Sequence, residues 1–401
     1  MKVLVLNSGS STIKYGLYRM PAELPLAQGV IERIGEAEGR FLQRDAEGER
    51  VEAMDVPDHA AGFAVLLERL AEHGAPDAIG HRVAHGGTRF SAAVRIDDAV
   101  LAAIREMSPL APLHNPANLA GIQAAMAARP GVPQVAVFDT AFHQSMPEHA
   151  WRFAVPEEWL ARYGVRRYGF HGTSIRHVSR AAAQYLDRDP GELALVVLHL
   201  GNGASATAVQ GGRSVDTSMG LSALDGLVMG TRCGDLDPAV PGYLAARAGL
   251  APAEIDRLLH EESGLKGLCG ASDMREIERR VGAGDARAEL ALEVFCHRAR
   301  RHVGALATSL GRLDALVFTG GIGEHQAGVR ARICAGLEVV GVRLDATKNA
   351  SPGALPAAVQ AADSRAAVLV IATDEEREIA RQVVDCLDAA GAETGVRHGF
   401  S

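Results

Sequence analysis

The distribution of apolar and polar positions predicts a β-hairpin at the start of the chain and another near its middle. An apolar run at Lys2–Leu6 is followed by a turn of small polar residues and a second β-like stretch at Thr12–Tyr18. The same order recurs at Leu195–Leu200 and Ala206–Val209. The hairpins lie about half a chain length apart, a spacing that predicts two domains of common architecture.

Between and after these hairpins, segments of helical spacing alternate with short apolar runs, and such alternation indicates α/β layers. The predicted helices are 60–73, 115–128, 174–186, 252–259, 286–310 and about 375–389, and the predicted strands are 78–83, 134–138, 315–318 and 367–371. The segment 347–363 is rich in Ala, Pro, Ser and Gly and predicts a surface loop, and 391–401 predicts a loose tail.

Length and composition fit an intracellular two-domain protein. The chain has 401 residues, 47% of them hydrophobic, which is more than one ordinary core requires. A net charge of −8 argues against a nucleic-acid partner. The cysteines lack CxxC spacing and indicate reduced thiols. Because the first apolar run is too short for a signal peptide and no run has the length of a membrane span, we expect a cytoplasmic protein without a membrane partner.

Three turns rich in Gly or Ser follow apolar strands. They cover residues 7–14 (NSGSSTIK), 199–205 (HLGNGAS) and 319–324 (TGGIGE). Glycines allow backbone amides to approach a phosphate group, and hydroxyl and lysine side chains add donors. None of the turns matches GxxxxGK[ST], and none is a GxGxxG followed by a helix. The pattern therefore predicts a phosphate site that is neither a P-loop nor a Rossmann site.

The chain resembles the acetate kinase family over nearly its whole length. The matching blocks, in family order, are VLVLNSGSSTIKY, GHRVAHGG, APLHNPANL, VFDTAFHQSMP, YGFHGTS, HLGNGAS, DTSMGLSALDGLVMGTRCGDLDP, FTGGIGEH and ATDEE. The resemblance implies the α/β fold shared by acetate and sugar kinases, seventy-kilodalton chaperones and actin. In that fold, two ribonuclease-H-like domains of mixed sheets flanked by helices enclose a nucleotide cleft.

That resemblance also sets expected domain boundaries and an assembly. An N-terminal acetokinase domain would comprise residues 1–140 and 376–401, and a C-terminal, nucleotide-binding domain would comprise 141–375. The resemblance also implies a homodimer. The implied reaction is the reversible, Mg²⁺-dependent, in-line transfer of the ATP γ-phosphoryl group to acetate, giving acetyl phosphate and ADP.

The chemistry of that reaction agrees with the residue types in the motifs. A carboxylate acceptor is already ionised at neutral pH and needs no general base. It does need its charge shielded from the polyphosphate, which calls for arginine, histidine and a cation. By resemblance, the catalytic residues are Arg82, Arg232, His171 and Asp139. The arginines would stabilise charge, His171 would bind the moving phosphoryl group, and Asp139 would organise the site.

The resemblance assigns the metal and the remaining binding residues. Asn7 and Glu375 would hold Mg²⁺, with Mn²⁺ as the alternative ion, and the neighbouring Glu376 leaves a one-residue shift open. The acid would be bound by Arg82 and a small apolar pocket of Ala84, Leu113, Phe170 and Ala223. ATP or ADP would be bound by Lys14, His199, Leu200, Gly201, Asn202, Gly203, Asp273, Met274, Arg275, Gly321, Ile322, Gly323, Glu324 and His325.

The sequence leaves four alternatives to compare with this interpretation. The family usually carries larger residues than Ala84 and Ala223, so a propionate or other short-chain acid kinase is the first alternative. A chaperone-like switch ATPase is the second, but its water nucleophile does not need two arginine motifs. A zinc site is the third alternative: His81 and His85 have the HxxxH spacing of a zinc-binding helix but lack its glutamate. A serine hydrolase is the fourth, but Ser205 lies in GASAT, which departs from the GxSxG motif at the last position.

Overall fold

The chain folds into two compact units. The computed structural model describes residues 1–396, and the side chains of residues 1–390. Unit 1 comprises Met1–Phe142 and the segment that begins at Asp374, and unit 2 comprises His143–Thr373. The chain passes from one unit to the other at two points, and each point lies two residues from the boundary expected from the sequence. The observed division places Glu375 in unit 1.

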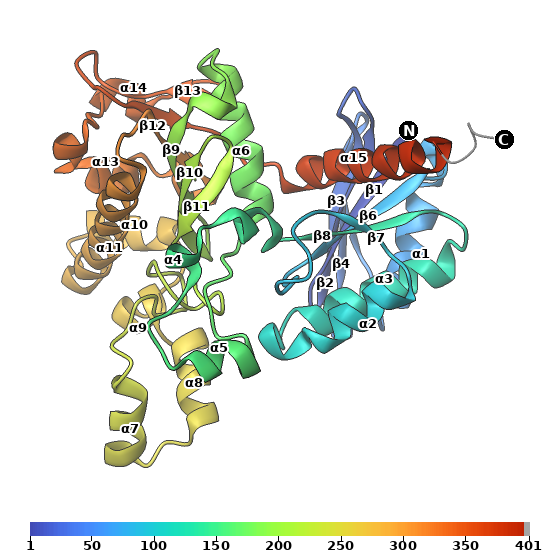
Figure 1. Cartoon of the computed structure of the whole chain (residues 1–401), viewed down its shortest axis with the longest axis horizontal. Coiled ribbons are helices and arrows are strands. Elements are labelled where there is room, and N and C mark those ends of the chain that lie inside the picture. The colour runs from blue at the N-terminus through green and yellow to red at the C-terminus, as the bar shows by residue number, and fades with distance from the viewer. Residues whose placement is uncertain (397–401) are drawn as a thin grey trace. The chain divides into compact units, whose positions relative to one another are not determined.

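Unit 1 is built on a mixed sheet with the strand order β5-β4-β3-β2-β1-β6-β8-β7 (Figure 1). Neighbours β1, β2 and β3 are antiparallel, whereas β6 is parallel to both β1 and β8. The strands are β1 (Lys2–Ser8), β2 (Thr12–Arg19), β3 (Leu24–Glu32), β4 (Arg40–Asp45), β5 (Gly48–Ala53), β6 (Ala78–Val83), β7 (Val94–Arg95) and β8 (Gln134–Phe138).

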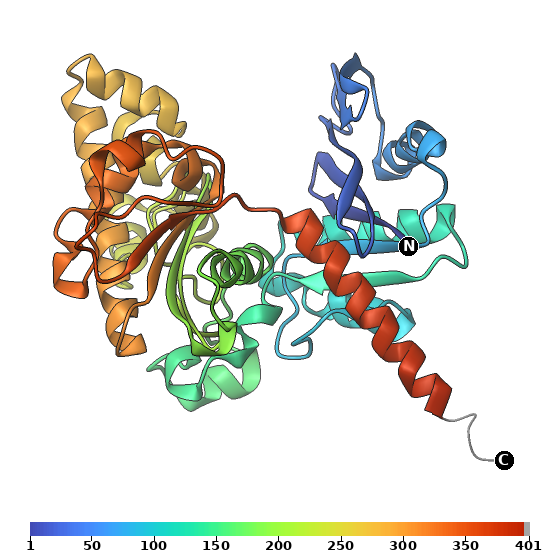
Figure 2. The same ribbon diagram turned by 90° about the horizontal axis from the view of Figure 1, so that it is seen from above.

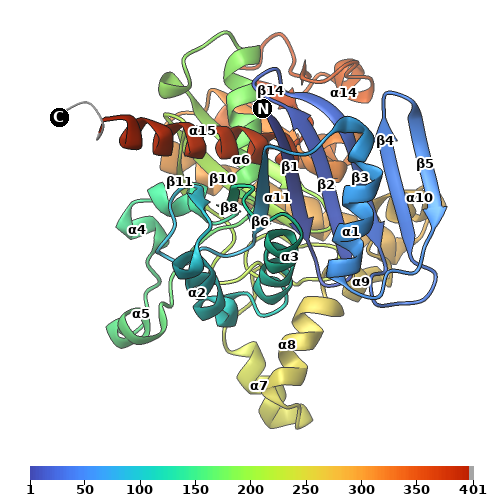
Figure 3. The same ribbon diagram turned by 90° about the vertical axis from the view of Figure 1, so that its right-hand side faces the viewer.

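Helices cover both faces of this sheet, because β1 is apolar on both sides. Val3 and Val5 share a buried cluster with Ile379 of α15, whereas Leu4 shares another with Phe63 of α1. Alternate residues of a strand point to opposite faces, so α15 and α1 lie on opposite sides. Figure 3 shows α1 and α3 in front of the strands. The helices are α1 (His59–Arg69), α2 (Asp98–Glu106), α3 (Asn115–Ala128) and α15 (Glu375–Val396).

Unit 2 repeats the same arrangement. Its strand order is β11-β10-β9-β12-β14-β13. Here too, three neighbouring strands, β11, β10 and β9, are antiparallel. The next two strands, β12 and β14, are parallel to β9. The predicted common architecture and α/β fold class are therefore confirmed. The strands are β9 (Ala194–Leu200), β10 (Ala204–Gln210), β11 (Arg213–Thr217), β12 (Ala315–Thr319), β13 (Ala357–Ala358) and β14 (Ala367–Val370).

The sheet of unit 2 lies between α6 and the long helix α11, which Figures 1 and 2 show on opposite faces. The side chain of Asp285 caps the start of α11 by accepting bonds from the amides of Arg287 and Ala288. The helices are α4 (Glu148–Trp151), α5 (Glu157–Tyr163), α6 (Gly172–Tyr185), α7 (Val240–Ala248), α8 (Pro252–Glu261), α9 (Gly264–Cys269), α10 (Met274–Gly282), α11 (Ala286–Leu310), α12 (Gly320–His325), α13 (Ala327–Cys334) and α14 (Ala346–Ala350).

Two sequence predictions are wrong in part. The predicted loop 347–363 contains most of α14 and the short strand β13, because Asp345 caps α14 and β13 pairs with β14. The predicted tail is helical as far as Val396, and residues 397–401 lie outside the described part. Among the described helices, none combines the length and the hydropathy that crossing a membrane requires.

Candidate active site

The carboxyl ends of three parallel strands bring predicted residues together in unit 1. Strands β1, β6 and β8 are neighbours, and their register places Leu6 beside His81 and Val83 beside Phe138. Asn7, Arg82 and Asp139 therefore come from adjacent strand ends, where ligand sites of parallel sheets commonly form.

Arg82 is the centre of this group, which we call the Arg82 cluster (Asn7, Arg82, Asp139 and Glu375). Its Nε donates to Asp139 Oδ1 at 3.1 Å, and its Nη2 donates to Asp139 Oδ2. Nη1 donates to Asn7 Oδ1 at 3.2 Å, and Glu375 Oε2 lies 3.8 Å from Nε. Such a bidentate pair fixes the plane of a guanidinium group as well as its position.

Burial and charge act against each other in the Arg82 cluster. Burial alone would lower the pKa of Arg82, but the charges of Asp139 and Glu375 outweigh burial and raise that pKa. Burial raises the pKa of the Glu375 carboxyl, with Asp139 adding to the increase and Arg82 opposing it. Because burial disfavours the ionised form of Glu375, a cation bound nearby would stabilise that form.

The two glutamates at the start of α15 differ in their surroundings. Arg82 and Lys14 both lower the pKa of Glu375, although burial raises it overall. Glu376 also has a raised pKa, from burial and from the charge of Glu375. Of the two, Glu375 is the one placed within 4 Å of Arg82. This placement favours Glu375 over Glu376 as the carboxylate that joins Asn7 in the predicted metal site.

The Arg82 cluster offers oxygen donors of the kind that magnesium prefers. Asn7 supplies an amide oxygen, and Asp139 and Glu375 supply carboxylate oxygens. The residues therefore fit a hard divalent cation. A separate grouping of Asp45, Glu72 and His73 has ligand atoms within 4.8 Å of one another, but no predicted site residue belongs to it.

The HxxxH pair has other partners. His81 is buried, its Nε2 lies 2.7 Å from Gln134 Oε1, and burial lowers its pKa to about 4. His85 Nδ1 accepts a hydrogen bond from the Gly87 amide at 3.0 Å. Both histidines thus serve the local structure, and the zinc alternative has no support from their contacts.

In unit 2, two of the predicted glycine turns follow neighbouring parallel strands. Residues 201–203 connect β9 to β10, and α12 begins directly after β12. The register pairs Thr319 with His199, so both turns lie at the same edge of the sheet. Gly320 has φ of 75°, and a Cβ there would lie 2.8 Å from the Leu200 carbonyl oxygen. Glycine at this position therefore allows the two turns to come close together.

Two histidines lie beside the first of these turns. The rings of His171 and His199 have centroids 4.3 Å apart and are tilted by 30°. His171 occupies the N-cap position of α6 with φ of 59°, an uncommon conformation for a residue other than glycine. Backbone conformations of this kind cluster at functional sites.

His171 and Arg232 converge above Gly203. A Cβ built on Gly203 would lie 3.3 Å from His171 Nε2 and 3.6 Å from Arg232 Nη1. The loop that carries Arg232 is joined to the same turn, because the Gly230 amide donates to the Asn202 carbonyl at 3.0 Å. The turn, the histidine and the arginine thus form one site within unit 2, which we call the Gly203 site.

Arg232 differs electrostatically from Arg82. Its Nη1 donates to the Ala223 carbonyl at 3.0 Å, and burial lowers its pKa. Within the described part of the chain it has no carboxylate partner. A partly buried guanidinium group without a counter-ion is suited to bind an anionic ligand.

The other predicted nucleotide residues have varied surroundings. The Glu324 carboxylate accepts from the amides of Gly320 at 2.9 Å and Thr373 at 3.0 Å, so it supports its own loop. Asp273 and Arg275 form an exposed ion pair at the start of α10, and the side chain of Met274 is buried in the core. His325 is exposed, and Lys14 belongs to unit 1.

The predicted acid-pocket residues are divided between the units. Ala84 and Leu113 belong to unit 1, where Ala84 is buried and Leu113 is 65% exposed. Phe170 and Ala223 belong to unit 2, where both contact the hydrophobic core. Ala223 is also linked to the Gly203 site through the Arg232 side chain.

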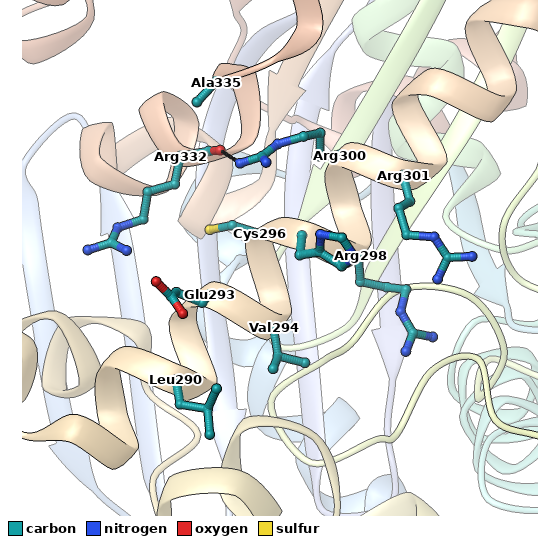
Figure 4. Close-up of a pocket in the computed structure, with 10 residues that line it drawn as sticks. Leu290, Glu293, Val294, Cys296, Arg298, Arg300, Arg301, Arg332 and Ala335 are labelled. Atoms are coloured by element: carbon teal, nitrogen blue, oxygen red, sulfur yellow. Dashed lines mark hydrogen bonds between the residues drawn. The ribbon is translucent and has the colours of Figure 1, made fainter.

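A cavity of about 560 Å³ beside α11 lies apart from these residues. It is lined by Leu290, Glu293, Val294, Cys296, His297, Arg298, Arg300, Arg301, Arg332 and Ala335. In Figure 4 the guanidinium groups of Arg301 and Arg332 point away from each other. The lining includes no predicted site residue, and its arginines do not converge on one ligand position.

Several polar residues that hold these sites were missed from the sequence. Asn118 accepts from the Ala84 amide at 3.0 Å and donates to the Ser8 carbonyl at 2.7 Å, and thereby ties the ends of β6 and β1 together. Ser174 and Ser205 contact the two histidines of the Gly203 site. Their presence in the matching blocks was the available signal, but local patterns do not reveal the partner of a hydroxyl group.

Comparison with known proteins gives consistent matches over almost the whole chain. The model of the acetokinase family matches residues 2–381. The chain is 50% identical over 410 aligned positions to an acetate kinase of Syntrophobacter fumaroxidans, covering 99% of this chain and all of that protein. It is 53% identical to an acetate kinase of Streptomyces avermitilis, covering 95% of this chain and 96% of that protein.

Solved structures give the same result. The crystal structure of Porphyromonas gingivalis acetate kinase superimposes with a TM-score of 0.91 at 42% identity, covering 96% of this chain and 99% of that one. A propionate kinase from Francisella tularensis also has a TM-score of 0.91, at 41% identity and with the same coverage.

Proposed function

The chain belongs to the acetokinase family, and we propose that it catalyses the reversible transfer of the γ-phosphoryl group of ATP to acetate, giving ADP and acetyl phosphate. One observation carries the proposal most directly. His171 Nε2 and Arg232 Nη1 approach the same position above Gly203, and Arg232 has no carboxylate partner among the described residues. A guanidinium nitrogen and an imidazole nitrogen that converge beside a glycine turn are suited to bind the oxygens of a phosphoryl group.

On this proposal, the acetate carboxylate attacks the γ-phosphorus directly as ADP leaves. An ionised carboxylate needs no general base, so the protein contributes positioning and charge stabilisation. Arg82 binds the acceptor carboxylate, and its bidentate contact with Asp139 holds the guanidinium group in a fixed orientation. Arg232 and His171 stabilise the charge on the equatorial oxygens of the phosphoryl group.

The nucleotide phosphates are proposed to bind at the two glycine turns of unit 2, residues 201–203 and the start of α12. Backbone amides at such turns bind phosphate oxygens well, because no side chain blocks their approach. Lys14 of unit 1 and the other predicted nucleotide residues belong to the same proposal. In these roles, unit 1 supplies the acid and metal residues and unit 2 most of the nucleotide residues.

Asn7 and Glu375 are proposed to hold Mg²⁺, or Mn²⁺ in its place, directly or through water. A divalent cation bound there would neutralise phosphate charge as that charge approaches an anionic acceptor. The donor set of the Arg82 cluster and the raised pKa of Glu375 support this assignment. The homodimer and the cytoplasmic location implied by the family resemblance complete the proposal.

Propionate is the second candidate acceptor. The family resemblance implies valine and proline where this chain has Ala84 and Ala223, and a pocket widened by these smaller side chains would accept one more methylene group. A close structural relative is named a propionate kinase. Acetate remains the primary assignment, because the high-identity relatives reported above are named acetate kinases.

A panel of carboxylic acids with hydroxylamine trapping tests both candidates. Acyl phosphate formed from each acid is converted to the hydroxamate and quantified. We expect acetate to give hydroxamate in the presence of ATP and Mg²⁺, and propionate to give it with kcat/KM within about tenfold of acetate. Absence of hydroxamate from every short-chain acid would contradict the proposed function.

A further inference from the structure

Two serines hold the histidines of the Gly203 site in a crossed arrangement. Ser174 lies in the first turn of α6, and its Oγ is 2.8 Å from Nδ1 of His199 on β9. Ser205 lies on β10, and its Oγ is 3.0 Å from Nδ1 of His171 at the start of α6. Thus a serine of helix α6 holds the histidine of the sheet, and a serine of the sheet holds the histidine at the start of α6. The contacts tie helix to sheet and fix both rings.

The crossed contacts orient both rings in the same way. Each Nδ1 faces a buried serine, and each Nε2 faces the glycine turn. A Cβ built on Gly203 would lie 3.3 Å from His171 Nε2, and one built on Gly201 would lie 3.8 Å from His199 Nε2. Whether the two rings offer hydrogen-bond donors or acceptors to a ligand at the 201–203 turn therefore depends on whether these two Nε2 atoms carry protons.

A neutral imidazole carries one proton, and its position follows from the partner of the other nitrogen. His143 illustrates this rule within unit 2. Its Nε2 lies 2.9 Å from the Phe170 carbonyl, which only accepts, and its Nδ1 lies 2.9 Å from Ser214 Oγ. Burial lowers the pKa of His143 to about 4, so the ring is neutral and Ser214 donates to Nδ1. A serine hydroxyl on Nδ1 with Nε2–H opposite is therefore already present in this protein.

We propose that Ser174 and Ser205 are positioning residues that donate to Nδ1 of His199 and His171 and thereby present two Nε2–H donors to the 201–203 turn. The inference rests on the proposed function, because phosphate oxygens are acceptors. Two Nε2 lone pairs at the same place would repel a phosphate group, whereas two N–H groups would bind it.

Thr373 extends the Ser174 contact into a chain of two hydroxyl groups and one imidazole ring. Its Oγ1 lies 2.8 Å from Ser174 Oγ, and its amide is fixed by Glu324 at 3.0 Å. A hydroxyl group has one proton, so Ser174 donates to His199 when Thr373 donates to Ser174. The proposed order of donation is Thr373 to Ser174 to His199 Nδ1, and in this order the proton of a neutral His199 is on Nε2.

The direct test is the tautomer of both rings in the full-length protein. Protein labelled with ¹⁵N-histidine is measured at about pH 8, above the ordinary imidazole pKa of about 6.5. Signals are assigned by their loss in His171→Gln and His199→Gln variants. We expect a protonated Nε2 and an unprotonated Nδ1 in both rings. Protonation of Nδ1 in either ring overturns the proposal. This readout needs no turnover, so it stands even if the parent lacks acetate-dependent activity.

Kinetics provide the second test. Ser205→Ala and Ser174→Ala should each lower kcat by about tenfold or more with little change in the KM values, and Ser205→Thr, which keeps the hydroxyl, should recover most of the loss. Thr207→Val is the matched control, because Thr207 is a buried hydroxyl residue of β10 whose Oγ1 contacts Thr217 Oγ1 at 2.8 Å. Parental kcat in both alanine variants, or an equal loss in the control, contradicts the proposal. If the alanine variants do not fold, the parent's tautomers decide it.

Discussion

Arg82 and Asp139 meet through two parallel contacts at the ends of neighbouring strands, and Asp139 is only 1% exposed. The pair belongs to unit 1, whereas Arg232 of unit 2 has no carboxylate partner among the described residues. Both arginines are proposed to act in the same reaction, but their removal should affect the free energy of unfolding differently. This contrast leads to the first prediction.

Arg82→Ala and Arg232→Ala should each lower kcat by about 10²-fold or more, because each removes charge stabilisation of the transition state. Arg82→Ala should also lower the free energy of unfolding by about 3–5 kcal/mol, since it removes the bidentate partner of the buried Asp139 carboxylate. Arg232→Ala should leave that free energy unchanged or higher, because burial disfavours its charge. Denaturant unfolding and steady-state kinetics measure both effects. Near-normal turnover in both folded variants would remove these residues from the mechanism.

Glu375→Gln should stabilise the metal-free protein at neutral pH. Burial raises the folded-state pKa of Glu375 above its unfolded value, so the folded state binds more protons between the two values. Stability from this group is therefore present below the ordinary glutamate pKa of about 4.3 and is lost as pH rises through the folded pKa. The glutamine variant lacks this loss, so its advantage in the free energy of unfolding should grow with pH. A difference independent of pH would contradict the prediction.

Magnesium should distinguish the two glutamates. Glu375→Ala should raise the Mg²⁺ concentration needed for half-maximal activity more than Glu376→Ala does. The reason is that Glu375, which lies within 4 Å of Arg82, belongs to the Arg82 cluster that is proposed to hold the ion. Titration of activity with Mg²⁺ after chelator treatment measures the effect, and the two variants serve as controls for each other. The reverse order would assign the metal to Glu376.

Gly203→Ala should abolish most activity without unfolding the protein. The new methyl group would lie 3.3 Å from His171 Nε2 and occupy the space proposed for a phosphoryl oxygen. Gly203 is not among the positive-φ residues, so alanine causes no backbone strain there. Gly304→Ala in α11 is the control, because a Cβ at that position meets no atom within 4 Å. Full activity of Gly203→Ala with either acid would show that the phosphoryl group binds elsewhere.

Ala84→Val should penalise propionate selectively. A pocket discriminates one methylene by about 1–3 kcal/mol, and the added methyl groups should restore that discrimination. The measurement is kcat/KM for acetate and propionate in parent and variant. An equal loss for both acids would show that Ala84 does not line the acceptor pocket.

The sequence predicted the elements more completely than their supporting contacts. Strands 78–83 and 134–138 were predicted at the observed bounds, the second from its short apolar run, and the motifs located Arg82 and Asp139 at their ends. Strand β5 was missed because it is mostly exposed and carries no apolar run. The contacts of Ser174 and Ser205 could not be predicted, since they join residues that the fold brings together from different elements.

The most direct test of the proposed reaction is ADP release from ATP with and without acetate, measured alongside acetyl hydroxamate. Transfer to the carboxylate predicts that ADP forms only with acetate and in a one-to-one ratio with hydroxamate. Arg232→Ala should lose both products together. ADP release at the same rate without acetate, with no hydroxamate formed, would instead indicate an ATPase with water as the acceptor and would contradict the proposed function.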